Sequence, residues 1–214
     1  MKFVTFIFSV LLVSGCSSTN SELIHHAENL NSHNNFGVCY GYGCKYYQKT
    51  GITDQEWQMV RNIFSPAAET AAQERDMIAK SIALIEQIIG PKTGTDQDNP
   101  GAVIINFNTK NQMDCIDEAF NSTSYLYLMR HDGLIRFHTL GAHLRRGISD
   151  FSYPHSTATI HEIGLPIVIE GEGHYVVDSW FHKNGALPEI IPAHIWKSRW
   201  HPDIKRERYN FSAS

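Results

Sequence analysis

The sequence predicts an α+β fold, in which N-terminal helices and a cysteine-bearing helix pack on an antiparallel β-sheet. From Thr53 to Arg130, apolar residues recur at the three- and four-residue spacing of helices that bury one face. After Gly133 the spacing changes to two, in segments separated by Gly, Pro, Ser and Asp, which is typical of strands joined by hairpins. Helices that precede the strands, instead of alternating with them, favour an antiparallel sheet. Because the chain has 214 residues and is 42% hydrophobic, it can build one sizeable core, and we expect residues 36–214 to form a single domain.

The first 35 residues indicate export and attachment to a membrane. Lys2 precedes a short apolar run, residues 3–13, which is too short to span a bilayer and is followed by small residues, as in a signal peptide. Residues 13–16 resemble the lipobox of bacterial lipoproteins. This resemblance implies a signal peptide of residues 1–15, lipidation of Cys16 and, because Ser17 follows, sorting to the outer membrane; an ordinary secretory signal is the alternative. Residues 16–35 are rich in Ser, Asn and His, so we expect a flexible tether.

Three helices are expected before the strands, and the N-terminal part of the domain, residues 36–90, should be helical. The first helix, 53–64, opens with the capping-box pattern of Thr53. The second follows Pro66 and ends at residue 89, before the stop signal Gly90-Pro91. Its apolar stripe points toward the core and consists of Ile78, Ile82, Ile85 and Ile89. The third helix starts at the cysteine at position 115 and ends near residue 130.

Four strands are expected after Gly133, at residues 134–144, 155–163, 166–170 and 174–181. Clusters of turn-forming residues separate them, as hairpins require. We expect these strands to form the sheet on which the cysteine-bearing helix packs.

Cys115 is the candidate nucleophile. It stands at the expected first turn of the third helix, where unpaired backbone N–H groups and the helix dipole stabilise a thiolate and can hold an oxyanion. A buried structural cysteine is the alternative, because free cysteines are among the most buried residues. In an exported protein an unpaired thiol is at risk of oxidation unless it is buried or kept for chemistry.

The remaining cysteines have other expected roles. Cys39 and Cys44 lie five positions apart in a Gly- and Tyr-rich stretch, so they can close a small disulfide loop in an oxidising compartment. A zinc site is the alternative for this pair, although no second pair with zinc-ligand spacing follows it. Because lipid takes Cys16, Cys115 is the one cysteine left over.

The order of residues after position 110 resembles the transglutaminase-like cysteine peptidase superfamily. The resemblance covers roughly residues 110–200 and rests on the stretch from Cys115 to Ala119, on His155 at the start of a strand, and on the later strand from Gly173 to Asp178, together with Arg130, Gly133 and Arg136. It implies a papain-like triad, in which Cys115 is the nucleophile, His155 the base and Asp178 the residue that orients the base.

One branch of this superfamily binds calcium through acidic residues that flank the cysteine. Asp114 matches that pattern, but Ile116 occupies the position after the cysteine. Hard cations need several oxygen ligands, so we assign no metal.

A histidine partner is also required by the chemistry of the thiol. Lowering a thiol pKa from about 8.5 to about 7 needs roughly 2 kcal/mol, and an imidazolium about 4 Å away supplies up to ~4 kcal/mol at an effective dielectric of about 20. That exceeds the repulsion of ~1 kcal/mol expected from each of Asp114 and Asp117. We expect His155 in this role, and His174, on the same strand face as Asp178, is the alternative.

Two further residues are expected at the site, and each has a simpler alternative role. Asp178 lies in an apolar strand, where an unpaired carboxylate is costly to bury, so an imidazole partner is expected; an aspartate that faces water at a strand end is the alternative. For the oxyanion, the backbone N–H of Cys115 is the leading donor, and the side-chain amide of Gln112 is a second candidate that a surface glutamine would equally explain.

Composition narrows the class of partner. The net charge is −4 and no basic run is longer than two residues, so nothing indicates a nucleic-acid partner, and no cofactor motif is present. We therefore expect a thiol-dependent acyl-transfer enzyme that acts on peptide or protein substrates at the cell envelope, either a peptidase or amidase or an amine-accepting transglutaminase. The alternative is a non-catalytic lipoprotein that uses the fold to bind peptide or cell-wall material.

Overall fold

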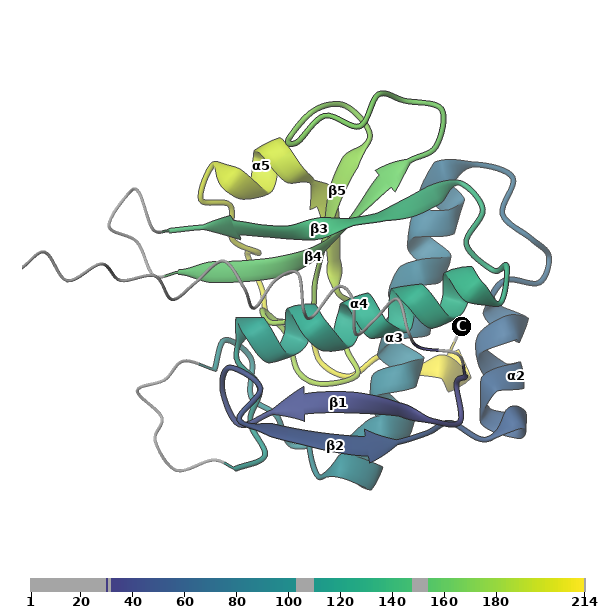
Figure 1. The fold of residues 1–214 in the computed structure, drawn as a ribbon, viewed down its shortest axis with the longest axis vertical. Coiled ribbons are helices and arrows are strands. Elements are labelled where there is room, and N and C mark those ends of the chain that lie inside the picture. Colours follow the sequence, from purple (N-terminus) through teal and green to yellow (C-terminus); the bar gives the residue numbers. More distant parts are fainter. Residues whose placement is uncertain (1–29, 31, 103–109, 148–153, 214) are drawn as a thin grey trace, which may run out of the picture.

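The computed structural model describes residues 30, 32–102, 110–147 and 154–213, and it confirms the predicted α+β class. Cys16 and the predicted signal peptide lie outside these residues. In the described part, a four-stranded antiparallel sheet and a two-stranded hairpin lie on either side of the cysteine-bearing helix, and further helices flank it (Figure 1). Among these residues, none of the helices combines the length and the apolar character needed to cross a bilayer.

The domain starts with a hairpin, and not with a helix as expected for residues 36–90. β1 (Phe36–Tyr40) pairs antiparallel with β2 (Tyr46–Thr50). β1 is buried throughout, whereas exposure alternates along β2. Strands of five residues show too little periodicity to be recognised, and contacts with distant parts of the chain decide their structure.

The predicted tether also extends too far. Leu30 is buried, and the backbone carbonyl of His33 accepts a hydrogen bond from the N–H of Ile52 at 2.8 Å. The ring of His33 stacks on Trp57, with centroids 5.0 Å apart. Packed structure is therefore present before Phe36; single packing residues among polar neighbours leave no periodic signal.

Two helices follow the hairpin. α2 (Asp54–Ile63) begins with the predicted capping box between Thr53 and Glu56. α3 (Ala71–Thr93) differs from the predicted 66–89 at both ends. It begins later because Thr70 supplies the side-chain acceptor for the first turn, and it passes through Gly90-Pro91 because a proline in the last turn removes only one N–H donor.

The cysteine-bearing helix and the larger sheet complete the fold. α4 (Cys115–His131) leads into a sheet of order β3-β4-β5-β6, in which all neighbours are antiparallel. The strands are β3 (His138–Arg146), β4 (His155–Glu162), β5 (His174–Asp178) and β6 (Glu189–Pro192). β6 is not predicted, since it has four residues and ends in a proline. The short helix α5 (Ala193–Lys197) and a 3₁₀ turn (Phe211–Ala213) follow.

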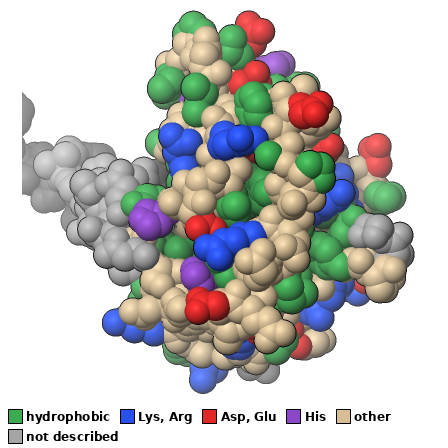
Figure 2. All heavy atoms as spheres, turned by 90° about the vertical axis from the view of Figure 1, so that its right-hand side faces the viewer, with side chains coloured by type: hydrophobic (Ala, Val, Ile, Leu, Met, Phe, Trp, Pro, Cys, Tyr) green, Lys and Arg blue, Asp and Glu red, His purple; other side chains and the backbone are tan. Residues whose placement is uncertain are grey.

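The predicted strand at residues 166–170 is wrong. These residues belong to the loop that joins β4 to β5, and the loop projects at the top of Figure 1, beside α5. Pro166 has no N–H to donate, and no described strand lies beside this segment to pair with it. Hydrophobic side chains are exposed at the same end of the molecule (Figure 2).

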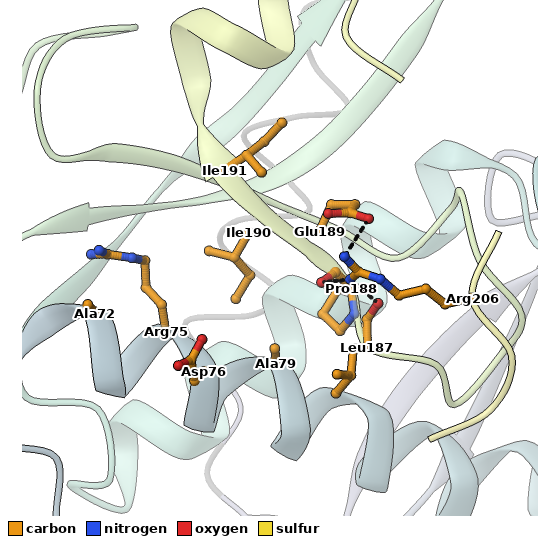
Figure 3. Close-up of a pocket in the computed structure, with 10 residues that line it drawn as sticks. All are labelled: Ala72, Arg75, Asp76, Ala79, Leu187, Pro188, Glu189, Ile190, Ile191 and Arg206. Atoms are coloured by element: carbon orange, nitrogen blue, oxygen red, sulfur yellow. Dashed lines mark hydrogen bonds and ion pairs between the residues drawn. The ribbon is translucent and has the colours of Figure 1, made fainter. Parts of the chain in front are cut away.

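A groove of about 620 Å³ lies between α3 and β6 (Figure 3). It has an apolar floor, and Arg75 and Arg206 lie on opposite sides of it. Both arginines are already paired, Arg206 with Glu189 at 2.9 Å and Arg75 with Glu162 at 3.2 Å. None of the predicted catalytic residues lines this groove.

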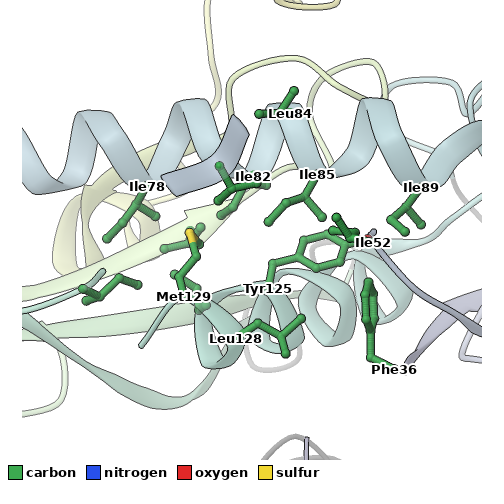
Figure 4. Packing of buried hydrophobic residues seen from close by; sticks show 14 of the residues in the cluster. Phe36, Ile52, Ile78, Ile82, Leu84, Ile85, Ile89, Tyr125, Leu128 and Met129 are labelled. Carbon is green, nitrogen blue, oxygen red and sulfur yellow. The ribbon is translucent and has the colours of Figure 1, made fainter. Parts of the chain in front are cut away.

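The main core lies between α3, α4 and the larger sheet. The predicted isoleucine stripe of α3 faces α4, and Phe36 and Ile52 close one end of the cluster (Figure 4). A smaller cluster, beside α5 and β6, contains Leu144, Val176, Phe181, Ala193 and Trp196. The main cluster joins the second half of α4 to β4, through Tyr125, Leu126, Ala158 and Ile160.

Candidate active site

Asp114 starts α4, so that Cys115 is the first residue of the helix. The Asp114 carboxylate accepts hydrogen bonds from the N–H groups of Ile116 and Asp117, both at 3.0 Å, and Asp117 accepts one from the Asp114 N–H at 3.2 Å. This reciprocal capping box explains why the helix begins here. The N–H of Cys115 is not used by the cap and lies against its own sulfur.

The turn of the β1–β2 hairpin braces this helix start. The N–H groups of Tyr42 and Cys44 donate to Asp117 at 2.8 and 2.6 Å, and that of Gly43 donates to Asp114 at 3.0 Å. The three groups converge because residues 41–44 all have positive φ, between 58° and 83°. Such successive N–H groups form a natural anion cradle, which here holds the two carboxylates that flank Cys115 in the sequence.

Cys39 and Cys44 form a disulfide across this turn. Cys39 is buried, and its N–H and carbonyl bond to the side chain of Asn121 at 2.8 and 2.9 Å. The hairpin is thus tied to α4 both at its first turn and further along. Within the described ranges, Cys115 is the free cysteine.

His155 and Asp178 are hydrogen-bonded on adjacent strands, with 2.7 Å between Nε2 and Oδ2. Both side chains are buried. The same Oδ2 accepts a second hydrogen bond from Nε1 of Trp196, also at 2.7 Å. Trp196 is a site residue that the sequence reasoning missed, because nothing in the pattern of α5 distinguishes it from an ordinary core tryptophan.

Aromatic side chains enclose the ring of His155. The ring centroids of Trp180, Phe181 and Trp196 lie 4.4, 5.2 and 5.3 Å from that of His155. Arg146 covers Trp196, with its guanidinium carbon 4.3 Å from the ring centroid, and donates to the Trp196 backbone carbonyl. Exclusion of water by these groups strengthens the hydrogen bonds to Asp178.

The thiol of Cys115 lies against the first residues of β4, on either side of His155. It donates to the carbonyl of Pro154 at 3.9 Å, and the N–H of Ser156 donates to its sulfur. Nδ1 of His155 is buried and has no hydrogen-bond partner in the part of the chain that the structure describes. The structure therefore brings the three predicted residues into one buried region, with one nitrogen of the imidazole bound to Asp178 and the other open.

Burial raises the pKa of the Cys115 thiol to about 12, against the hydrogen bond from the Ser156 N–H, and the charges of Asp114 and Asp178 raise it further. The direction is opposite to the lowering expected from the sequence. Packing of α4 on β4 removes the thiol from water, and the loss of solvation outweighs what the helix end contributes. The resting thiol is therefore protonated at neutral pH, and any reaction needs a base to take its proton.

Buried carboxyl groups also lie on α3, on α4 and in the loop before α4. Burial raises the pKa of Glu118 and of Asp98, and it raises those of Asp117 and Glu86 to about 7.

The side chain of Gln112 forms hydrogen bonds to residues 97 and 99, earlier in the segment that precedes α4. Its Oε1 accepts from the N–H and Nδ2 of Asn99 at 2.9 and 3.1 Å, and its Nε2 donates to the carbonyl of Gln97 at 3.0 Å. One of its two amide hydrogens is thus already engaged. Of the two expected oxyanion donors, the backbone N–H of Cys115 is the one without a competing acceptor other than its own sulfur.

His174, the alternative base, has other partners. Its ring stacks on that of His161 at 4.1 Å, and its Nδ1 accepts from the N–H of Glu170 at 2.8 Å. Burial, with a contribution from His161, lowers the pKa of His174 to about 4. It lies four residues before Asp178 on β5, about 13 Å along a strand, so it does not meet the same carboxylate.

Within residues 30, 32–102, 110–147 and 154–213, no group of three or more His, Cys, Asp or Glu side chains is arranged to hold a metal ion. Comparisons with protein-family models, with curated proteins and with solved structures return no match. The likeness to transglutaminase-like peptidases therefore stays a prediction, and function has to be inferred from the site itself.

Proposed function

We propose that the protein is a thiol-dependent acyl-transfer enzyme that acts on peptide or amide bonds at the cell envelope, in the manner of transglutaminase-like cysteine peptidases. The observation that supports this most directly is the setting of His155. Its Nε2 is held by Asp178 at 2.7 Å, its buried Nδ1 lacks a partner, and the residues before and after it touch the thiol of Cys115. An imidazole oriented through one nitrogen and open at the other is suited to general base catalysis.

In the proposed reaction, Nδ1 of His155 takes the thiol proton while the sulfur of Cys115 attacks the carbonyl carbon of an amide. The C–N bond then breaks, the amine leaves with the proton from His155, and the acyl group remains on sulfur as a thioester. Water or a second amine releases the acyl group. The start of α4 and the Cys115 N–H stabilise the oxyanion. A thiol pKa of about 12 favours proton transfer during attack over a preformed thiolate.

The test is a comparison of Cys115 reactivity between matched variants. The chain is treated with iodoacetamide at pH 7, and mass spectrometry gives the rate at Cys115 for wild type, for His155→Gln, which keeps much of the side-chain volume, and for His161→Ala as control. Loss of a general base is expected to slow alkylation by about 100-fold in His155→Gln, with no change in His161→Ala. Equal rates in wild type and His155→Gln would remove His155 from the mechanism.

The envelope location rests on the lipobox-like residues 13–16 and has its own test. Cys16→Ser is expected to release the protein from the membrane fraction or to block its processing, because the thiol that would carry the lipid is absent. Unchanged fractionation and unchanged size would contradict the anchor and leave the proposed chemistry untouched.

A non-catalytic envelope lipoprotein that binds peptide or cell-wall material is the second candidate. The raised pKa of the buried Cys115 thiol favours this second candidate, because a thiol that stays protonated is a poor nucleophile. In that case Cys115 of the folded wild type resists iodoacetamide and becomes reactive only after unfolding, and Cys115→Ser leaves peptide binding unchanged.

A further inference from the structure

The loop between β4 and β5, residues 163–173, carries four exposed aliphatic side chains. Ile167, Val168 and Ile169 are 72%, 52% and 73% exposed, and Ile163 is 51% exposed. Contiguous apolar exposure of this kind is uncommon on soluble proteins and marks a contact surface. The loop follows the last residue of β4, whereas His155 is the first, so this surface is separate from the candidate active site.

Hydrogen bonds and one packed side chain hold the base of the loop. The N–H of Gly171 donates to the carbonyl of Val168 at 3.0 Å, and the N–H of Glu170 donates to Nδ1 of His174 at 2.8 Å. Leu165 turns inward, where a Cβ added to Gly173 would lie 2.7 Å from its side chain. One aliphatic residue therefore anchors the loop, and those at the tip are left outside the core.

Charges around the tip are largely balanced. Glu162 pairs with Arg75 at 3.2 Å, and Glu170 lies 3.5 Å from Lys197, while Glu172 is exposed. This rim has a small surplus of negative charge, so it offers no attraction to an anionic surface. The driving force for contact at this site is apolar burial.

Three successive side chains do not all lie on one face of either a helix or a strand, so a protein partner with one flat face would cover only part of Ile167, Val168 and Ile169. Lipid surrounds an inserted segment on all sides. A bilayer is also the surface to which the sequence is expected to attach this chain, through Cys16. We propose that loop 163–173 inserts its aliphatic tip into the lipid bilayer.

Insertion of this loop orients the domain without anchoring it. A single short apolar insertion, like a single acyl chain, gives weak and reversible membrane binding, and a second signal makes it stable. β4 has eight residues, so His155 stands about 25 Å from the loop end of the strand. The beginning of α4 and β4 is thereby held away from lipid. The membrane contact itself is independent of the proposed chemistry.

The experiment uses the mature chain with Cys16→Ser, which removes the expected lipid, and sedimentation with phosphatidylcholine vesicles. The parent is compared with Ile167→Ser/Ile169→Ser and with Ile204→Ser, a matched control because Ile204 is 74% exposed outside the loop. The loop variant is expected to partition into vesicles at least about tenfold more weakly than the parent, and Ile204→Ser equally well. Adding phosphatidylglycerol is expected to give no gain.

Circular dichroism confirms that each variant is folded. Absence of vesicle binding by the parent, or equal binding by the loop variant, overturns the proposal. Light scattering without vesicles tests whether the loop instead binds a second copy of the chain. If the mass of the parent rises with concentration while the loop variant stays monomeric, the loop mediates self-association and the proposal is also overturned.

Discussion

His138 and His155 lie on adjacent strands of the larger sheet, and each binds a buried carboxylate. Nδ1 of His138 is 2.8 Å from Glu74, and Nε2 of His155 is 2.7 Å from Asp178. The difference lies at the other ring nitrogen. That of His138 faces Arg75 at 3.2 Å, whereas that of His155 has no partner among the described residues. A buried histidine–carboxylate pair is therefore no sign of catalysis by itself, and the proposed role of His155 rests on its free ring nitrogen and on the contacts of its two neighbours with the Cys115 thiol.

The carboxylate that binds His138 likewise has further backbone partners. Glu74 also accepts the N–H groups of Arg136 and Phe137 at 2.7 and 2.9 Å. Burial opposes ionisation of Glu74, but the hydrogen bonds from His138 and from these N–H groups outweigh it and lower its pKa. This pair therefore joins α3 to the start of β3, and its role is structural.

The largest effect is expected on removing the structural pair. Glu74→Ala leaves His138 and two backbone N–H groups without their acceptor in a buried site, so the free energy of unfolding should fall by about 3–5 kcal/mol. Urea unfolding measures this, with the exposed Glu69→Ala as control. Loss below about 1 kcal/mol, or slower alkylation of Cys115 in the folded fraction, would contradict the assignment.

Glu86 sharpens the comparison because it is a buried carboxyl without an imidazole. Burial raises its pKa from 4.5 to about 7, so the folded state takes up a proton that the unfolded state lacks between these values. Stability from the neutral form is present below pH 4.5 and is lost as the pH rises through 7. Glu86→Gln stays neutral and should remove this loss, which amounts to at most ~3 kcal/mol between pH 5 and pH 8.

Urea unfolding of wild type and Glu86→Gln at the two pH values measures this contribution together with the part of the raised pKa of Asp98 and Glu118 that the charge of Glu86 causes. The variant should retain the acceptor for the Gly185 N–H, which donates to Glu86 at 2.6 Å. An equal pH dependence in the two chains would show that Glu86 ionises normally in the folded protein.

Asp178→Asn tests the charge of the candidate catalytic pair while keeping an oxygen acceptor. Alkylation of Cys115 at pH 7 should slow by about 100-fold, because a neutral amide no longer stabilises an imidazolium. The matched control is Glu189→Gln, which makes the same change in the pair that Glu189 forms with His182 at 2.8 Å. Similar slowing in both variants would point to a general loss of packing.

Trp196→Phe removes one hydrogen bond to Asp178 and keeps an aromatic ring in the same cluster. A hydrogen bond to a charged group contributes about 1.5–3 kcal/mol, so alkylation should slow by at least about tenfold. Trp200→Phe is the control, because Trp200 belongs to the same aromatic cluster through its contact with Phe181, whereas the hydrogen bond to Asp178 comes from Trp196. An unchanged rate of Cys115 alkylation in Trp196→Phe would show that this tryptophan is an ordinary core residue.

Most of the large elements could be predicted because their patterns are long. The isoleucine stripe of α3 repeats one signal over several turns, whereas β1 and β2 have five residues each. The hairpin also depends on N–H donation to Asp114 and Asp117, which no local pattern contains. The apolar run at residues 166–170 was misleading because apolar character alone does not supply a neighbouring strand.

At the candidate site, residue types were accessible from sequence and their environment was not. The family resemblance implied that His155 and Asp178 are partners, and the structure places them within hydrogen-bond distance on the directly paired strands β4 and β5. The pKa of Cys115 depends on how closely α4 packs on β4, so its direction could not be inferred from a helix start. Trp196 approaches Asp178 only after α5 has docked on the sheet.

The turn of the first hairpin has a consequence for the order of folding. Its N–H groups reach carboxylates 71 to 75 positions later in the chain, and closing loops of that length is entropically unfavourable. Tyr42 and Cys44 adopt left-handed conformations that are unfavourable until those carboxylates are in place. The hairpin, although it is synthesised before α4, is therefore expected to become stable only once α4 has begun to form. During that interval the thiols of Cys39, Cys44 and Cys115 are all unpaired, so in the oxidising compartment that the sequence predicts there would be three possible pairings, of which one is productive.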